Sequence, residues 1–309
     1  MKNKVIITCA ITGGIHTPTL SPYLPYRPDD IAHQAIDAAE AGASILHLHA
    51  RDPATGQPTG DINIYKQFLG SIYNNTDAVI NITTGGSPNM TPEERLAAVL
   101  EFQPEMCSLN MGSMNFSFHP LANKIKDWQF DWEEEYIRNS DAFIFRNTFH
   151  DIEKNYNLTK NLNIKFEHEC YDLSHLYNLA FFRSQGYFQD SIFVQGVFGI
   201  LGGIGASLDN LVFMKNTAQK LFGDDLNWST LSAGKTQMPM VTHSALIGGH
   251  VRVGLEDSLF LSKGQLAESN ASQVKKIRKI IEELGFEVAT PDEARQILGL
   301  KGKEAVNIS

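Results

Sequence analysis

The segment 45–52, Ile-Leu-His-Leu-His-Ala-Arg-Asp, is the stretch that most clearly indicates the fold. It is apolar at its start and follows a helix-like segment that ends at 41–43, as a buried parallel strand does after a crossover helix. Side chains alternate along a strand, so His47 and His49 share one face, about 7 Å apart. Two imidazoles at that spacing can ligate one metal ion, but two histidines that hydrogen-bond at a strand end would give the same pattern.

Strand and helix patterns alternate along the whole chain, which is typical of parallel strands joined by right-handed crossovers. Strands are predicted at 4–12, 45–49, 78–86, 105–113, 142–148, 164–172, 191–199, 228–233 and 250–257. Eight strands close a (β/α)8 barrel, so the ninth and weakest candidate, 142–148, is assigned to an excursion in the loop after the fourth strand.

We therefore predict the α/β class, with residues 1–309 forming a single TIM-barrel catalytic domain and additional helices near the C-terminus. The alternative is an open doubly wound sheet. The glycine-rich run 199–205 could cradle a phosphate in such a sheet, but it lies late in the chain and does not match the dinucleotide fingerprint.

Helices fill the intervals between the strands. They are predicted at 29–41, 63–74, 91–102, 120–139, 152–159, 174–185, 208–222, 238–247, 267–284 and from 290 onward. The starts at 91–94 and 290–293 both read Thr-Pro-acidic-Glu, which is a capping box with proline at the first helical position. The acidic run 133–135 is predicted to be a solvent-exposed face.

Composition narrows the functional classes. The chain has 309 residues, 42% of them hydrophobic and 20% charged, as in ordinary globular proteins. A net charge of −9 without a block of Lys and Arg argues against a nucleic-acid partner. The basic start at 1–4 continues into a strand without a cleavage site, and no apolar run could span a membrane. Cys9, Cys107 and Cys170 lie far apart and fit buried free thiols in the cytoplasm.

Polar residues gather where the predicted strands end, which in a barrel is the catalytic rim. The candidates are Thr12, His47, His49, Thr83, Thr84, Gly85, Gly86, Ser108, Asn110, Glu169, Arg252, Glu256 and Asp257. The hydroxyls and amide, together with the backbone N–H groups of 85–86, suit a carboxylate or an enolate oxygen. The alternative is that these polar groups cap the N-terminus of the following helix, but Ser87 or Thr91 already provides that cap.

The last strand, 250–257, supplies the candidates that complete a metal site. Alternate positions place Arg252 and Glu256 on one face, and strand eight of a closed barrel lies close to strand two. Glu256 can therefore join His47 and His49. Two imidazoles and one carboxylate with an open position are typical of catalytic zinc, although a facial-triad iron would use the same ligands.

Asp257 follows immediately and can turn toward Arg252. A carboxylate paired with arginine is expected to have a lowered pKa, to stay ionised and to act as a base beside a metal-bound carbonyl. A structural ion pair on the rim is the alternative.

Taken together, six motifs resemble the β-keto acid cleavage enzyme family, first described for 3-keto-5-aminohexanoate cleavage. They are 10–13 Ala-Ile-Thr-Gly, 47–49 His-Leu-His, 83–86 Thr-Thr-Gly-Gly, 105–110 Glu-Met-Cys-Ser-Leu-Asn, 169–171 Glu-Cys-Tyr and 252–258 Arg-Val-Gly-Leu-Glu-Asp-Ser. The resemblance covers nearly the whole chain and implies a zinc-dependent barrel enzyme. Its members react a β-keto acid with acetyl-CoA to give acetoacetate and a new acyl-CoA.

The resemblance also implies roles for individual residues. Zinc would be held by His47, His49 and Glu256, and Asp257, paired with Arg252, would deprotonate the α-carbon. The enolate would add to the acetyl thioester, CoA would transfer within the adduct, and a retro-Claisen step would release acetoacetate. Thr83 keeps the hydroxyl of a position where the family often has Ser. Glu169 matches a polar position lining the pocket.

One departure from the family pattern bears on the substrate. Members that cleave the aminated acid carry Glu two residues after the first Thr-Gly, where this chain has Ile15 followed by His16. The resemblance therefore argues against an aminated substrate. Arg27 and Arg146 are candidates for an acidic or polar tail, for CoA phosphates, or for ordinary surface charges.

Two other functional classes stay open on the residues alone. A metal-dependent hydrolase or lyase could use the same His-His-Glu set without CoA, and a barrel that only binds a ligand could carry it without catalysis. The resemblance also implies a homo-oligomer, a dimer or a tetramer. The aromatic segment 128–149 is the predicted interface, with ordinary packing over the barrel rim as its alternative.

Overall fold

The computed structural model describes residues 4–87 and 90–309, and the basic start at 1–3 lies outside them. Within this part of the chain, eight parallel strands close a barrel, as predicted. In order around the barrel they are β2 (Ile7–Ala10), β3 (Ile45–Leu48), β6 (Val79–Ile82), β7 (Met106–Asn110), β10 (Lys165–Cys170), β11 (Ile192–Phe198), β12 (Leu226–Ser232) and β13 (His250–Val253). Strand β13 pairs with β2 and closes the ring.

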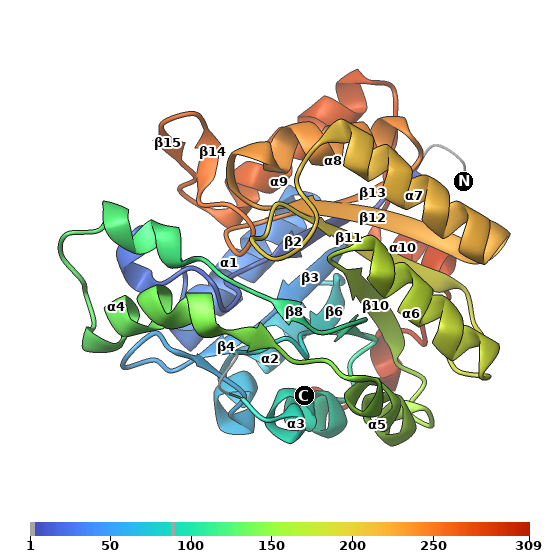
Figure 1. The fold of residues 1–309 in the computed structure, drawn as a ribbon, viewed down its shortest axis with the longest axis horizontal. Helices are drawn as coiled ribbons and strands as arrows, with labels where there is room; N and C mark the ends of the chain where they lie inside the picture. The colour runs from blue at the N-terminus through green and yellow to red at the C-terminus, as the bar shows by residue number, and fades with distance from the viewer. Residues whose placement is uncertain (1–3, 88–89) are drawn as a thin grey trace.

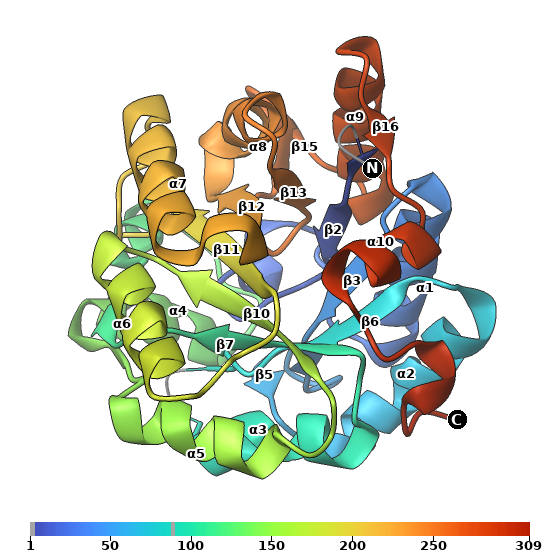
Figure 2. The ribbon, with the colours of Figure 1, turned by 90° about the vertical axis from the view of Figure 1, so that its right-hand side faces the viewer.

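A helix follows each barrel strand and packs on the outside of the barrel (Figure 2). These helices are α1 (Pro28–Ala41), α2 (Ile62–Asn75), α3 (Pro92–Phe102), α5 (Phe149–Thr159), α6 (Leu173–Ser184), α7 (Leu208–Phe222), α8 (Gln237–Leu246) and α9 (Asn270–Glu283). The capping box predicted at the start of α3 is present, with Thr91 and Glu94 bonded to each other's backbone. The described helices include none long and apolar enough to cross a membrane.

The final helix, α10 (Pro291–Leu298), covers the N-terminal end of the barrel. Ala294 and Leu298 pack into a cluster with Ile6, Ile45 and Phe193 from the barrel strands. A short pairing of β1 (Lys4–Val5) with β16 (Glu287–Val288) holds this segment in place, so the predicted first strand divides into β1 and β2. With this end covered, the site must lie at the other end.

The predicted excursion after the fourth strand is confirmed. Strand β8 (Met114–Asn115) pairs antiparallel with β9 (Ile144–Phe145), which lies within 142–148, and α4 (Asp131–Arg138) lies between them in the sequence. Figure 1 shows α4 on the same side as the hairpin of β14 (Phe260–Ser262) and β15 (Gln265–Leu266), away from the N-terminus. Strand β4 (Ala50–Arg51) pairs with β5 (Pro58–Thr59) near this end. The excursion and these hairpins form the rim.

Two predictions about the excursion hold only in part. Most of 120–139 is helical, in the 3-10 helix at His119–Lys124, in α4 and at the start of the 3-10 helix at Asn139–Ala142, but the helix is interrupted where the backbone N–H of Gln129 donates to Thr19 Oγ1. Of the acidic run, Glu135 is exposed as predicted but Glu133 is fully buried, and its Oε2 accepts hydrogen bonds from Thr17 Oγ1 at 3.1 Å and from the Thr19 N–H at 3.3 Å. Tertiary contacts with the loop after β2 determine both outcomes.

The interface at the aromatic segment 128–149 stays a prediction. Five of its aromatic side chains, Trp128, Phe130, Trp132, Phe143 and Phe145, are buried or half-buried, whereas Phe149 is 52% exposed. Phe145 belongs to a cluster on the rim, with Trp128 and Phe143 packed against it. Ordinary packing over the barrel rim, the alternative, describes these five side chains. The three cysteines are free and buried, as predicted.

Strand β13 ends earlier than predicted because of Gly254. This residue has φ +141°, and a Cβ there would lie 2.0 Å from the backbone oxygen of Ala10. The chain therefore turns sharply where β13 meets β2, and 254–257 leave the sheet.

This close approach predicts a large loss of stability in Gly254→Ala. We expect about 3 kcal/mol or more, because backbone strain and a clash with main chain combine. Gly264→Ala is the control, since Gly264 has φ +76° but nothing within 4 Å of its Cβ position; it should cost about 1 kcal/mol. Urea denaturation measures both, and equal losses would contradict the account of Gly254.

Candidate metal and active site

His47, His49 and Glu256 converge at the C-terminal end of the barrel. His47 lies in β3 and His49 directly follows that strand. Their Nε2 atoms are 3.3 Å apart, and Glu256 Oε1 lies 3.7 Å from His47 Nε2 and 3.4 Å from His49 Nε2. All three ligand atoms lie within 4.8 Å of one another. The structure thus brings together the three predicted metal ligands.

The surroundings of these residues fit a metal ion. Glu256 Oε2 is buried and has no hydrogen-bond partner among the described residues. On the far side of the imidazole, His47 Nδ1 lies 3.3 Å from Glu167 Oε2. A carboxylate behind a histidine fixes the ring and raises the basicity of its other nitrogen, as in known metal sites. Two imidazoles and one carboxylate form a donor set typical of catalytic zinc.

Arg252 lies at the centre of the site and contacts four carboxylates. Its guanidinium is buried, with only 2% exposed. It donates to both Asp257 oxygens at 3.1 Å, to Glu256 Oε1 at 2.7 Å and to Glu169 Oε1 at 3.1 Å. Glu167 Oε2 is 3.9 Å away. One positive charge among four carboxylates leaves an excess of negative charge, which a divalent cation would offset.

The electrostatics of Asp257 differ from the prediction. A lowered pKa was expected from its pairing with Arg252, but burial raises the pKa of Asp257 to about 7, against the opposing effect of the guanidinium. Burial likewise raises the pKa of Glu169. The prediction considered only the ion pair, whereas desolvation and the neighbouring carboxylates favour the protonated form.

Glu256 and Asp257 are placed in the site by a turn after β13, and not by the alternation of side chains along a strand. After Gly254, α9 braces the turn: Asn270 Oδ1 accepts from the Leu255 N–H at 2.9 Å, and Gln273 Oε1 accepts from the Gly254 N–H at 2.8 Å. Gly13, with φ +62°, makes room on the other side, since a Cβ there would lie 2.3 Å from Glu256 Cγ. The carboxylate of Glu256 is therefore fixed by two other parts of the chain.

A cavity of about 50 Å³ opens beside the metal ligands. Its wall includes Thr83, Gly85, Gly86 and Glu169, together with Ile15. Thr83 Oγ1 accepts from the Gly85 N–H at 2.9 Å, so its own hydroxyl proton can still be donated. Of the predicted neutral donors, the Thr83 hydroxyl therefore lines the cavity beside His47 and His49, directly after β6.

Three predicted site residues do not line this cavity, and two of them, Thr12 and Ser108, hold the surrounding structure instead. Thr12 Oγ1 donates to the Pro25 carbonyl and accepts from Arg51 Nε at 2.8 Å. Ser108 Oγ accepts from the Thr84 N–H at 3.1 Å, which holds the turn after β6. Asn110 is fully buried, and its amide has no partner among the described residues.

A second cavity, of about 320 Å³, adjoins the first. Both include Ile15, Phe116 and Glu256 in their walls, and the second continues past His16 and Asp257. Its wall is otherwise mainly apolar and reaches the glycine-rich loop at 199–201. A substrate bound at the metal position can therefore extend into this space.

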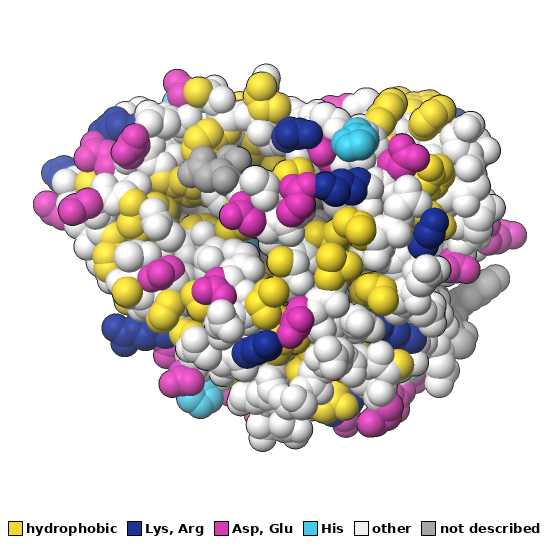
Figure 3. All heavy atoms as spheres, turned by 90° about the horizontal axis from the view of Figure 1, so that it is seen from below, with side chains coloured by type: hydrophobic (Ala, Val, Ile, Leu, Met, Phe, Trp, Pro, Cys, Tyr) yellow, Lys and Arg dark blue, Asp and Glu magenta, His cyan; other side chains and the backbone are white. Residues whose placement is uncertain are grey.

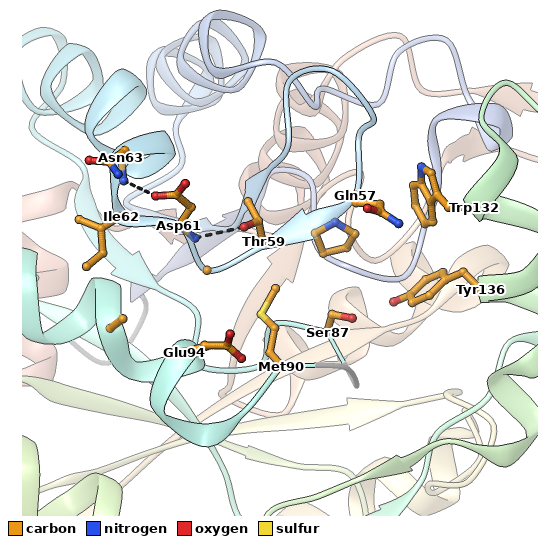
Figure 4. Close-up of a pocket in the computed structure, with 13 residues that line it drawn as sticks. Gln57, Thr59, Asp61, Ile62, Asn63, Ser87, Met90, Glu94, Trp132 and Tyr136 are labelled. Atoms are coloured by element: carbon orange, nitrogen blue, oxygen red, sulfur yellow. Dashed lines mark hydrogen bonds between the residues drawn. The ribbon is translucent and has the colours of Figure 1, made fainter.

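A third cavity, of about 570 Å³, includes Tyr136 in its wall (Figure 4). Tyr136 also lines the metal cavity, and its hydroxyl donates to the Gly14 carbonyl at 2.8 Å. The acidic side chains here have structural roles, because Asp61 caps α2 and Glu94 caps α3. The residues predicted to bind the metal and to act as the base thus line the two smaller cavities and not this one.

On the face of the molecule shown in Figure 3, Lys and Arg side chains are interspersed with Asp and Glu side chains.

Sequence reasoning assigned no role to several residues of the site. Glu167 shares its strand face with Glu169, so alternation along β10 was the signal that could have found it. Tyr171, whose hydroxyl donates to Glu169 Oε2 at 3.1 Å, continues the same alternation within the strand predicted at 164–172. The two arginines considered for the substrate tail or for CoA have partners within the chain. The guanidinium of Arg146 forms an ion pair with Asp151 at 2.9 Å, and that of Arg27 lies over the ring of Tyr26.

Comparison with known proteins is consistent with this geometry. The model of the beta-keto acid cleavage enzyme family matches residues 4–300. A Paraburkholderia graminis protein named 3,5-dioxohexanoate:acetyl-CoA acetone transferase is 52% identical, with 99% of each chain covered. A 3-keto-5-aminohexanoate cleavage enzyme of Fusobacterium nucleatum is 34% identical over 97% of this chain and 100% of its own.

Among solved structures, apo ObcA is similar in fold, with a TM-score of 0.72 at 18% identity. The similarity covers 91% of this chain and 66% of ObcA. The family match and the close relatives extend over nearly all of the chain that carries the site. The chain belongs to the beta-keto acid cleavage enzyme family.

Proposed function

We propose that this chain is a zinc-dependent enzyme that cleaves a β-keto acid with acetyl-CoA, giving acetoacetate and a new acyl-CoA. The observation that carries the proposal is the convergence of His47, His49 and Glu256 beside the Arg252–Asp257 pair, in a member of this family. Relatives named as acetyl-CoA-dependent transferases support the co-substrate.

His47, His49 and Glu256 would hold the metal. When bound, zinc would supply Lewis-acid polarisation of the keto and carboxylate oxygens, which makes the α-proton more acidic. Glu167 would orient His47 through Nδ1, and Arg252 would hold Glu256 through Oε1. Zinc is proposed over iron because the proposed reaction needs a Lewis acid and no redox step.

The chain's own residues would then carry the proton and orient the substrate. Asp257, held at both oxygens by Arg252, would take the proton from the α-carbon. The Thr83 hydroxyl and the backbone N–H of Gly86 would bind the substrate carboxylate. The resulting carbanion forms a bond to the acetyl carbon of the thioester, and CoA moves to the keto carbon as the original C2–C3 bond breaks.

The lining of the cavities supports a β-keto acid with a neutral tail, such as 3,5-dioxohexanoate. Ile15 places an aliphatic side chain where the two cavities meet. The carboxylates nearby, Glu256 and Asp257, are both bound by Arg252, so neither is free to pair with a substrate ammonium. Burying an unpaired ammonium here would be costly.

We further propose a cytoplasmic homo-oligomer. Free buried cysteines support a reducing compartment. Exposed aromatic side chains on neighbouring outer helices, Phe181 of α6 and Phe213 of α7 among them, support contacts between copies, and Phe149, at the end of the predicted segment 128–149, stacks on Phe181.

Metal dependence follows from the proposed ligands. His47→Ala should lower the zinc content of the purified protein to background and acetoacetate release by at least about 100-fold. His33→Ala, which alters an exposed histidine of α1, should change neither. Elemental analysis and an acetoacetate assay measure both quantities. Full activity in metal-free protein would contradict the proposal.

Removal of the base should separate chemistry from metal binding. Asp257→Asn keeps the shape of the side chain but cannot accept the α-proton, so kcat should fall by about 10²–10⁴-fold while zinc stays bound. Steady-state kinetics and metal analysis on the same preparation test this. If the variant retained wild-type kcat, Asp257 would not be the base.

Substrate choice should respond to charge at residue 15. The wild type should release acetoacetate from 3,5-dioxohexanoate with acetyl-CoA and act poorly on 3-keto-5-aminohexanoate. Ile15→Glu should raise kcat/KM for the aminated acid by about tenfold or more, since it adds a carboxylate for the ammonium. Ile15→Gln, similar in size but uncharged, should not. An equal gain in both variants would exclude charge pairing as the cause.

A further inference from the structure

We infer from the position of His16 how the tail of the substrate is recognised. It lies on the wall of the 320 Å³ cavity and is half-buried. Its Nδ1 is 2.9 Å from the carbonyl oxygen of Leu255, the residue before the proposed metal ligand Glu256. The imidazole is thus attached to the same turn that carries the catalytic carboxylates.

The hydrogen bond to Leu255 fixes the tautomer of His16. A carbonyl oxygen only accepts, so the proton of the neutral ring must be on Nδ1. Nε2 then carries a lone pair and can only accept. The neutral form is favoured here because burial lowers the pKa of His16 to about 4, and the Arg51 guanidinium, which donates to the His16 carbonyl at 2.7 Å, also opposes a positive charge.

Few other polar side chains line this cavity. Among the described residues of its wall, Ser117, Glu256 and Asp257 are the others. Ser117 Oγ lies 2.7 Å from His119 Nδ1 and 3.3 Å from Ser140 Oγ, and the two carboxylates contact Arg252. His16 Nε2 forms no hydrogen bond within residues 4–87 and 90–309. It is therefore an uncommitted acceptor in a largely apolar space.

The two cavities indicate which part of the substrate reaches this acceptor. The metal cavity, at about 50 Å³, has room for little beyond the carboxylate and keto groups. The rest of a six-carbon acid must pass Ile15 and Phe116 into the larger cavity, where His16 lies.

We propose that His16 Nε2 accepts a hydrogen bond from a hydroxyl on the fifth carbon of the β-keto acid. The hydroxyl would come from a 5-hydroxy acid, or from a 3,5-dioxo acid whose C4 proton has moved to the C5 oxygen while C3 stays a ketone. This inference rests on the proposed function and specifies its substrate class: acids with a neutral donor at C5.

The test compares three acids that differ at C5: 3-oxohexanoate, 5-hydroxy-3-oxohexanoate and 3,5-dioxohexanoate, each with saturating acetyl-CoA. The wild type should prefer at least one oxygenated acid over 3-oxohexanoate by about tenfold in kcat/KM, the effect of one hydrogen bond in a buried site. A preference for the 5-hydroxy acid identifies an alcohol as the donor, and a preference for the dioxo acid identifies the enol.

Variants assign that preference to His16. His16→Leu should abolish it. Leucine also removes the hydrogen bond to the Leu255 carbonyl, so kcat/KM for all three acids can fall together, and the ratio between the acids is the readout. Each ratio is measured within one preparation, so loss of folded protein cancels. His16→Gln, which retains an acceptor, should keep part of the preference, and Ser117→Ala, in the same cavity wall, should keep all of it.

Two results would overturn the inference: equal kcat/KM for all three acids in the wild type, or a preference that survives in His16→Leu. Neither would touch the proposed function, which stands if 3-oxohexanoate yields acetoacetate only with acetyl-CoA. Failure of the proposed function is recognised separately, as turnover that needs no acetyl-CoA.

Discussion

The buried guanidinium of Arg252 is the interaction on which the site depends. It contacts Glu169, Glu256 and Asp257 at 2.7–3.1 Å and lies 3.9 Å from Glu167, so one cation holds carboxylates from β10 and from the turn after β13. Arginine suits this role because its planar fork donates in several directions and stays charged. The remaining negative charge is compensated only in part by protonation, and it favours a divalent ion between His47, His49 and Glu256.

The barrel makes this arrangement possible because it brings distant segments to one rim. His47 and His49 come from the second strand, Glu169 from the fifth and Arg252 from the eighth. Gly254 and Gly13 then allow the turn with Glu256 to lie directly against the first strand. The groups of the candidate site are thus placed by packed strands and by α9, while the excursion adds Phe116 and Tyr136 to the wall of the cavity beside the histidines.

The parts predicted from sequence were those encoded by local patterns. Alternating strand and helix periodicity gave the barrel, including the excursion at 142–148, and strand alternation placed His47 beside His49. Contacts between distant segments were beyond that reasoning. Glu133 is buried by the loop at 17–19. The pKa of Asp257 is raised by burial, which the pairing of Asp257 with Arg252 does not indicate. Glu256 was assigned correctly as a neighbour of the histidines, but the turn that places it depends on Asn270 and Gln273 of α9.

The central claim is that carbon from acetyl-CoA becomes part of the acetoacetate released. Its most direct test is the reaction of unlabelled 3,5-dioxohexanoate with acetyl-CoA that carries ¹³C at both acetyl carbons, followed by NMR of the products. The account predicts label at C3 and C4 of acetoacetate and none in the new acyl-CoA, because the C2 carbanion attacks the acetyl carbonyl. Unlabelled acetoacetate would mean that water, and not the thioester, receives the cleaved fragment, and would contradict the account.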